Sequence, residues 1–161
     1  MAQAALTAVN ELTRMLQSDT GLPAAIAEIS TELPAVCVSD IVAGHSAADL
    51  LDKTNYVKYP FFRVYCDRVI NKLNEKFRTF SGTTELIVEV RVTHEHVEEL
   101  HGQLNAYVQA VTDVLDRNRG AWIPGIFHAG TYEISFQPVK RGGKNFTQSA
   151  RVRVEAHVSI D

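Results

Sequence analysis

A strict two-residue alternation at the end of the sequence, SARVRVEAHVSI over residues 149–160, is the feature that most constrains the fold. Apolar residues occupy every second position from Ala150 to Ile160, and charged or polar residues lie between them. This period separates the side chains of a β-strand onto two opposite faces. The sequence therefore predicts a final strand that buries one face and presents a row of charges on the other.

Three earlier segments also have the character of strands. Residues 61–71, FFRVYCDRVIN, are rich in aromatic and β-branched residues, and residues 84–93, TELIVEVRVT, alternate as the last strand does. Residues 132–139 form the third, and the glycine-containing loop KRGGKNF joins it to the last strand. A short loop of this kind predicts an antiparallel hairpin between the last two strands.

Helical periodicity marks two parts of the chain. The stronger signal runs from about His94 to Asn118, where Thr93 is the expected N-cap and Gly120 ends the helix. Its apolar residues recur at helical spacing, and acidic residues near its start complement the helix dipole. Towards the N-terminus, residues 4–17 and 23–31 are predicted to form two shorter helices separated by SDTGLP.

The connections are less regular. Residues 34–59 are expected to be an extended arm, in which AVCVSDIVAG has strand character and SAADLLDK could form a helical turn with Ser46 as N-cap. NKLNEKFRTFSG (71–82) is expected to carry a turn and a polar connection, and AWIPGIFHAG (121–130) to be a loop.

Together these elements predict an α+β fold in a single domain that covers residues 1–161. Its core, residues 60–161, is expected to be a mostly antiparallel sheet of about four strands with one long helix packed on one face. A helical segment, residues 1–33, and the arm, residues 34–59, precede this core. A chain of 161 residues is long enough to bury a core of this kind.

The second face of the sheet carries the row of charges and is the principal candidate site. The face would lie open or against a partner, because the long helix covers only the first face. Its residues are Glu89, Arg91, Arg151, Arg153, Glu155 and His157.

The formal net charge of −3 disfavours a dedicated nucleic-acid binder, but the charge is unevenly distributed. Residues 1–56 contain seven acidic residues and two strong bases, whereas residues 139–153 contain five bases and no acid. Such asymmetry is typical of unlike surfaces that meet in an oligomer, and also of an uneven solvated surface. No apolar run approaches the length of a membrane span, and no signal peptide is expected. Cys37 and Cys66 are expected to be reduced thiols.

Two alternatives to a structural role remain open. His94, His96 and His101 could bind a metal in a small enzyme, although Glu98 stands where the metalloprotease spacing needs its second histidine. A DNA-binding accessory module could instead use the five bases near the C-terminus. These are Lys140, Arg141, Lys144, Arg151 and Arg153. Phosphate-loop and nucleophile-elbow motifs do not occur in the sequence, so no catalytic residue and no cofactor are predicted.

Four segments carry a resemblance to a known family: LQSDTGLPAAIAEI, YPFFRVYCDRV, ELIVEVRVTHEHVEELHGQLNAYVQAVTDVLDRN and the final hairpin TYEISFQPV…ARVRVEAHVSI. Their order resembles that of small tail-completion proteins of long-tailed bacteriophages, above all the tail terminators. Head–tail connectors and other neck proteins share this general build. The resemblance covers residues 1–33 and 60–161 and rests on architecture, because no short motif defines it.

The resemblance implies a virion protein without enzymatic activity, assembled in the cytoplasm of the bacterial host. Proteins of this family form a hexameric ring that caps the finished tail tube and joins it to the head or neck, with no membrane involved. The charged face would then contact a neighbouring subunit or line the channel, where DNA would pass without specific contacts. Residues 34–59 would grip a neighbour. A basic loop would contact the tube or the neck: Lys140, Arg141, Gly142, Gly143 and Lys144.

Overall fold

The computed structural model describes residues 2–44 and 58–161. Three α-helices lie in this part of the chain: α1 (Ala2–Gln17), α2 (Leu22–Ile29) and α4 (Val97–Arg117). A short 3₁₀ helix, η1, covers Val38–Asp40. The two N-terminal helices and the long helix predicted from periodicity are therefore present, while the helical turn expected at SAADLLDK falls outside the described residues.

The long helix begins at Val97 and not at His94, and the prediction of Thr93 as its N-cap is wrong. The N-cap position is His96, because strand β3 (Phe80–His94) pairs with strand β7 (Asn145–Ile160) as far as His94. The Thr93 hydroxyl donates a hydrogen bond to the carbonyl oxygen of Phe146 at 3.1 Å. Pairing with the last strand thus outweighs the local helical signal.

The sheet has seven strands in the described residues, where the sequence predicted about four. Its order is β1-β2-β3-β7-β5-β4, and β6 pairs with β7 beside this path. The other strands are β1 (Ile41–Ala43), β2 (Phe61–Asn71), β4 (Gly120–Ile123), β5 (Ile126–Phe136) and β6 (Lys140–Gly142). All pairs are antiparallel except β1 with β2, so the sheet is mixed.

Residues 121–130, predicted to be a loop, instead supply most of β4 and the start of β5. Gly125, with φ +85°, forms the turn between these strands, and its carbonyl oxygen accepts a hydrogen bond from the Ser159 amide at 2.8 Å. Gly130, with φ +102°, lies where β5 changes register against β7. The glycines that favoured a loop therefore shape a hairpin turn and a bulge.

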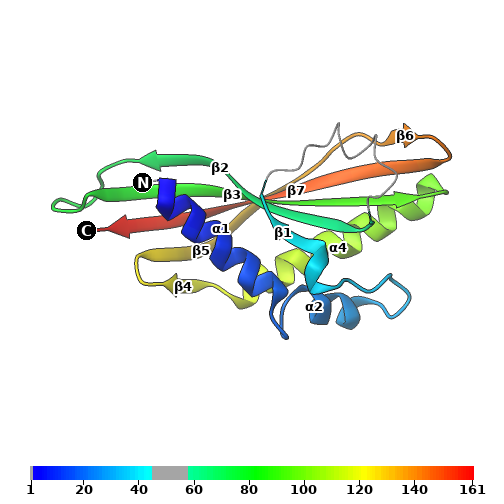
Figure 1. Ribbon diagram of the computed structural model, residues 1–161, viewed down its shortest axis with the longest axis horizontal. Helices are drawn as coiled ribbons and strands as arrows, with labels where there is room; N and C mark the ends of the chain where they lie inside the picture. Colours follow the sequence, from blue (N-terminus) through cyan, green and yellow to red (C-terminus); the bar gives the residue numbers. More distant parts are fainter. Residues whose placement is uncertain (1, 45–57) are drawn as a thin grey trace.

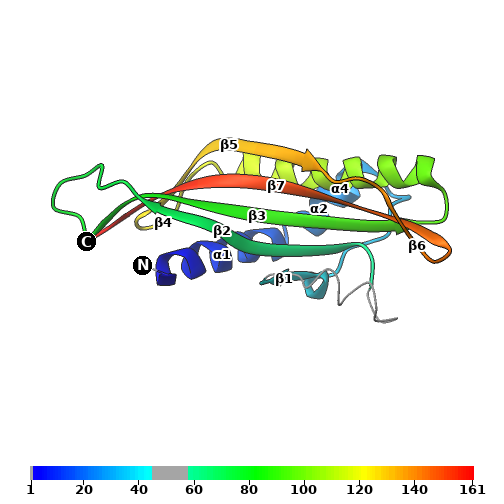
Figure 2. The same cartoon turned by 90° about the horizontal axis from the view of Figure 1, so that it is seen from above.

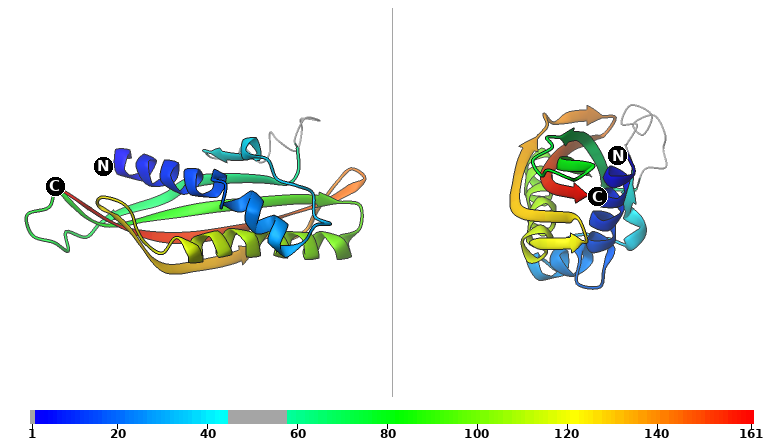
Figure 3. Two further views of the ribbon diagram at one scale, coloured as in Figure 1. Left: turned by 90° about the horizontal axis from the view of Figure 1, so that it is seen from below. Right: turned by 90° about the vertical axis from the view of Figure 1, so that its left-hand side faces the viewer.

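All three helices cover one face of the sheet, and no described helix lies on the other face (Figures 2 and 3). α1 packs mainly on β1 and β2, α4 packs on β3 and β7, and α2 packs on α4. The apolar positions of the last strand point into this layer, where Val152, Val154 and Ala156 are fully buried. The predicted α+β class and the helix-covered face are confirmed, although α1 as well as α4 packs on the sheet and α2 lies on that side against α4.

The molecule is elongated along its strands, and its two ends differ (Figure 1). One end carries the loop between β2 and β3 together with the C-terminus. The other end carries the β6–β7 hairpin and the junction between β3 and α4. Seen end-on, the sheet is curled (Figure 3).

Candidate assembly site: the charged face, the sheet edges and the loop end

The charged residues predicted to form the site lie on the face of the sheet opposite the helices. Arg151 of β7 pairs directly with Glu89 of β3, and Glu155 pairs with Glu85. Directly paired residues of neighbouring strands share a face. The prediction from sequence omitted Glu85, although the alternation of TELIVEVRVT was sufficient to place it beside Glu89.

Glu85 is one of two buried carboxylates at the centre of this face. Its Oε1 accepts a hydrogen bond from Arg68 Nη2 at 2.5 Å, and its Oε2 lies 3.9 Å from Arg153 Nε. Arg153 Nη2 of β7 also lies 3.8 Å from Asp67 Oδ2 of β2. This ion pair joins the two strands that lie on either side of β3. The hydrogen bond to Glu85 raises the pKa of Arg68, so this guanidinium remains charged.

Glu89 is the second buried carboxylate. It is 3% exposed, and its Oε1 lies 3.8 Å from Arg91 Nη2 and 4.0 Å from Arg151 Nε. Arg91 is itself 7% exposed and places its guanidinium 5.3 Å from the ring centroid of Phe61. Because a buried charge without a partner costs several kcal/mol, roughly 3–5 for a broken pair, these arginines and acids stabilise each other. The centre of the face is therefore largely neutralised within one subunit.

The rim of the face is more accessible than its centre. Arg151, Arg153 and His157 are exposed, and His157 Nε2 lies 3.8 Å from Glu155 Oε1. Tyr65 is half-buried beside them, and burial together with Glu89 raises the pKa of its hydroxyl. Of the residues predicted for this face, the accessible ones are thus those of β7, and not Glu89 and Arg91. Arg68 of β2 and Glu133 of β5 are exposed on the same face.

Both lateral edges of the sheet leave a strand without a described neighbour. β1 pairs with β2 only at 62–64, and from Cys66 to Asn71 the outer side of β2 pairs with no described strand. On the opposite side, β4 pairs with β5 only at 126–128, and residues 132–136 of β5 have no described outer partner. Edge strands of this kind are templates for pairing with another chain.

The edge of β5 also carries exposed apolar side chains. Ile134 and Phe136 are 38% and 42% exposed, and Glu133 is the one charged residue between Tyr132 and Phe136, where no lysine, arginine or proline occurs. Proteins that avoid association usually protect such an edge with these residues or with an inward charge. The β5 edge is therefore suited to contact with a further strand.

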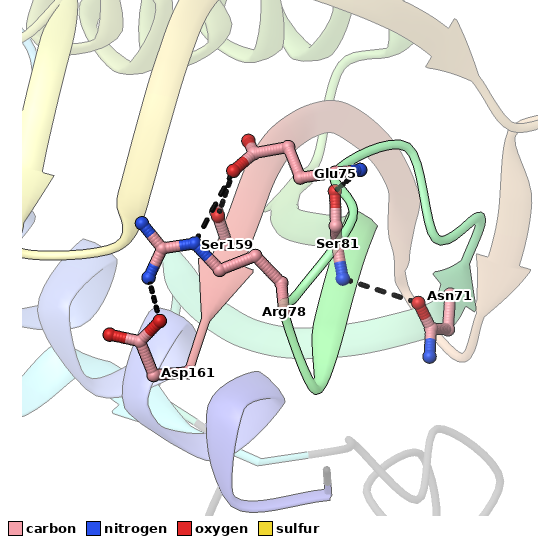
Figure 4. A network of polar contacts seen from close by, with 6 residues as sticks. All are labelled: Asn71, Glu75, Arg78, Ser81, Ser159 and Asp161. Atoms are coloured by element: carbon pink, nitrogen blue, oxygen red, sulfur yellow. Dashed lines mark hydrogen bonds and ion pairs between the residues drawn. The ribbon is translucent and has the colours of Figure 1, made fainter.

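The loop between β2 and β3, residues 72–79, is fixed by side-chain hydrogen bonds (Figure 4). Asn71 Oδ1 accepts hydrogen bonds from the amides of Leu73 and Ser81, both at 3.2 Å. The amide of Glu75 donates to Ser81 Oγ at 3.0 Å. The first half of the loop is thus tied to both strands that it connects.

The second half of the loop is tied to the C-terminal strand. Ser159 Oγ donates a hydrogen bond to Glu75 Oε2 at 3.0 Å, and Arg78 Nε lies 3.4 Å from the same oxygen. Arg78 Nη1 also donates to the carboxylate of Asp161 (Figure 4). These contacts fix the backbone on either side of Phe77.

Two apolar side chains of this loop face solvent. Leu73 has φ +49° and is 62% exposed, and Phe77 has φ +73° and is 101% exposed. The sequence predicted only a polar connection here, because an aromatic residue between two strands is normally expected to join the core. A phenylalanine flanked by lysine and arginine was the only available signal.

A pocket of about 310 Å³ lies beside the same loop. The β4–β5 turn and β7 provide its apolar wall, and the loop contributes Asn74 and Glu75. The wall residues are Ile123, Pro124, Phe127 and Val158. An apolar recess and an exposed aromatic ring therefore occur side by side at one end of the molecule.

The basic loop predicted to contact the tube or neck lies at the opposite end. Part of it is the short strand β6, which pairs with β7 through Arg141 and Phe146 and through Gly142 and Asn145. The Arg141 guanidinium lies 5.8 Å from the ring centroid of Phe146. Gly143, with φ +67°, makes the tight turn. The exposed bases Lys140 and Lys144 are thus carried on a defined hairpin.

The three histidines of THEHVEELH belong to different structural settings. His94 ends β3, and its Nδ1 accepts a hydrogen bond from the His96 amide at 3.0 Å while its Nε2 lies 3.0 Å from Glu99 Oε2. His101 lies on α4 against the ring of Phe136, with 5.9 Å between centroids. His94 therefore precedes the helix that carries His101. The described residues contain no cluster of three side chains arranged to hold a metal ion.

No model of a protein family matches the chain, and no curated protein matches it significantly. In residues 2–44 and 58–161, no helix has the length and apolar content that a membrane crossing requires.

Proposed function

We propose that this protein is a structural component that assembles into a ring and caps the tail tube of a long-tailed bacteriophage, as tail terminators do. The observation that carries the proposal is the pair of edge segments that pair with no described strand on their outer side, Cys66–Asn71 of β2 and residues 132–136 of β5, on opposite sides of one sheet. The order of elements supports the family, since the segments that resemble tail-completion proteins form one α+β unit.

Pairing of the β5 edge of one copy with the β2 edge of the next would continue the sheet from subunit to subunit. The two edges differ, so the contact is heterologous, and heterologous contacts give closed rings or open filaments according to the rotation between copies. Each backbone hydrogen bond gained contributes about 0.5–1.5 kcal/mol. The apolar side chains of Ile134 and Phe136 add to this stabilisation when they are covered.

The remaining surfaces receive roles that follow from this arrangement. The exposed guanidinium groups of Arg151 and Arg153 face a neighbouring subunit or the channel, and DNA passing through the channel meets few specific contacts. The β6–β7 hairpin, with Lys140 and Lys144 exposed, contacts the tube or the neck. The protein is accordingly a virion component assembled in the host cytoplasm.

Edge-blocking variants test the ring. A lysine on an edge strand opposes pairing with another chain, so Ile134→Lys on β5 and Val69→Lys on β2 should each give a monomer. Wild-type protein should show a mass near that of one hexamer, or of two stacked hexamers, by light scattering and a closed ring with a central hole in negative-stain images. Val97→Lys, a matched change at an exposed valine of α4, should leave the ring intact.

Two results would contradict the proposal. One is a wild-type protein that remains monomeric over the whole accessible concentration range. The other is a wild-type oligomer whose mass and image are unchanged by both edge variants, because assembly would then use other surfaces.

A further inference from the structure

The loop between β2 and β3 holds an aromatic ring away from its own protein. Phe77 is fully exposed, and its left-handed backbone conformation costs a residue with a side chain about 1 kcal/mol or more. Glu75 and Arg78 lie on either side of Phe77. Glu75 accepts a hydrogen bond from Ser159, and Arg78 donates one to Asp161 (Figure 4). The ring is therefore presented by a fixed backbone and has no stabilising contact within the described part of its own subunit.

The pocket beside the loop is large enough to receive such a ring. A buried apolar cavity of about 150 Å³ accommodates benzene, and the pocket here measures about 310 Å³. Its wall of Ile123, Pro124, Phe127 and Val158 is apolar, as a phenyl ring requires. An anchor in a pocket of this kind is the usual centre of a binding surface between proteins.

We infer that this end of the molecule is self-complementary: Phe77 of one copy enters the pocket of a second copy, whose own Phe77 enters the pocket of the first. The knob and the pocket lie side by side, since Asn74 and Glu75 of the knob loop also line the pocket. A two-fold axis through such a surface places each knob opposite the other copy's pocket, which is the isologous arrangement. This contact uses strand ends, so it is independent of the edge pairing proposed for the ring.

The same end carries charges of both signs. The loop has exposed Lys72 and Lys76, and Glu75 and Asp161 are acidic positions of the same surface. Both carboxylates pair with Arg78 of their own subunit but stay 54% and 87% exposed, so they remain accessible to a lysine of the second copy. A contact made by one loop and one pocket belongs to the small, weak class of interfaces, those under about 1,200 Å². The dimer is accordingly weak alone, and it strengthens when several copies are held together.

Analytical ultracentrifugation over a wide concentration range tests the exchange. Phe77→Asp removes the knob, and Ala121→Trp fills the pocket from an exposed lining position. Each variant should weaken dimerisation at least tenfold. The measurements are made in the full chain and again in the Ile134→Lys background, where lateral association is blocked, so that failure of the ring and failure of the exchange are distinguished.

An equimolar mixture of the two variants gives the decisive result. The Phe77→Asp chain still offers a pocket and the Ala121→Trp chain still offers Phe77, so the mixture should form a heterodimer more tightly than either variant pairs with itself. The control is Val97→Asp, which also replaces an exposed apolar residue with aspartate but at the opposite end of the molecule. This variant should dimerise as the wild type does. Dimerisation unchanged by both variants, a wild type that stays monomeric at millimolar concentration, or a mixture that associates no better than its components would overturn the inference.

Discussion

Among single residues, His128 has the least favourable surroundings. It is fully buried, and its ring centroid lies 5.4 Å from that of Trp122. Neither ring nitrogen makes a hydrogen bond of normal geometry with the described residues, although the Glu155 backbone lies near enough to act on the ring. Burial lowers the pKa of His128; the backbone of Glu155 opposes this effect, Arg119 adds to it and Asp116 opposes it. The folded protein therefore resists protonation at this position more than the unfolded chain does.

Acid should destabilise the protein through His128. As the pH falls through the unfolded value of about 6.5, the unfolded chain takes up a proton that the folded state resists. The free energy of unfolding should fall by up to about 1.4 kcal/mol per pH unit until the lowered folded pKa is reached. Urea unfolding at pH 7, 6 and 5 measures this slope.

A pair of histidine variants identifies the source of that slope. His128→Leu should remove this part of the pH dependence, because leucine has no group that takes up a proton. His157→Gln, at an exposed position, should retain it. Equal slopes for His128→Leu and the wild type would show that another group is responsible.

Among the elements, the β4–β5 hairpin depends most on a single backbone conformation. Gly125→Ala should lower the free energy of unfolding by about 1–3 kcal/mol, because φ is +85° and the new Cβ would lie 2.7 Å from the Ser159 carbonyl oxygen. At Gly102 on α4, an added Cβ would meet no neighbouring atom within 4 Å. Gly102→Ala should therefore raise the free energy of unfolding by about 0.5–1 kcal/mol. Urea denaturation of both variants checks the opposite signs, and a neutral Gly125→Ala would contradict the turn geometry.

The strands that sequence predicts are those whose side chains alternate. The final strand and residues 84–93 reveal their buried face directly, and the aromatic and β-branched segment 61–71 matches β2. β4 and the start of β5 are hidden, because Pro124, Gly125 and Gly130 have the composition of a loop. They become strands only through pairing with each other and with β7, which a single sequence does not display.

The candidate site is likewise predictable only where it follows from the alternation of side chains along a strand. Alternation places Glu89, Arg151 and Arg153 on one face, since parity alone decides this. It does not indicate that Glu89 is buried, which depends on side chains contributed by β2 and β7. Nor does it reveal the exposure of Phe77, because aromatic residues between strands usually enter the core.

At the scale of the whole molecule, the bases of the sheet face, Arg151 and Arg153, should have a different role from the bases of the β6–β7 hairpin, Lys140 and Lys144. The double variant Arg151→Glu/Arg153→Glu removes cations beside the buried Glu85 and Glu89. It should lower the free energy of unfolding by about 1–2 kcal/mol, a value reduced by the exposure of both arginines. It should also impair ring formation, because the rim of the face changes sign. Thermal unfolding and light scattering measure the two effects.

The matched control makes the same change of charge at the other end. Lys140→Glu/Lys144→Glu alters exposed hairpin residues that have no described ion pair with the β3 carboxylates. The unfolding free energy and the ring should therefore be unchanged, while binding to tail tubes in a sedimentation assay should be lost. If the hairpin variant abolishes the ring and the sheet-face variant does not, the assembly surface lies at the hairpin end, because the lateral contacts cannot then depend on the charged face.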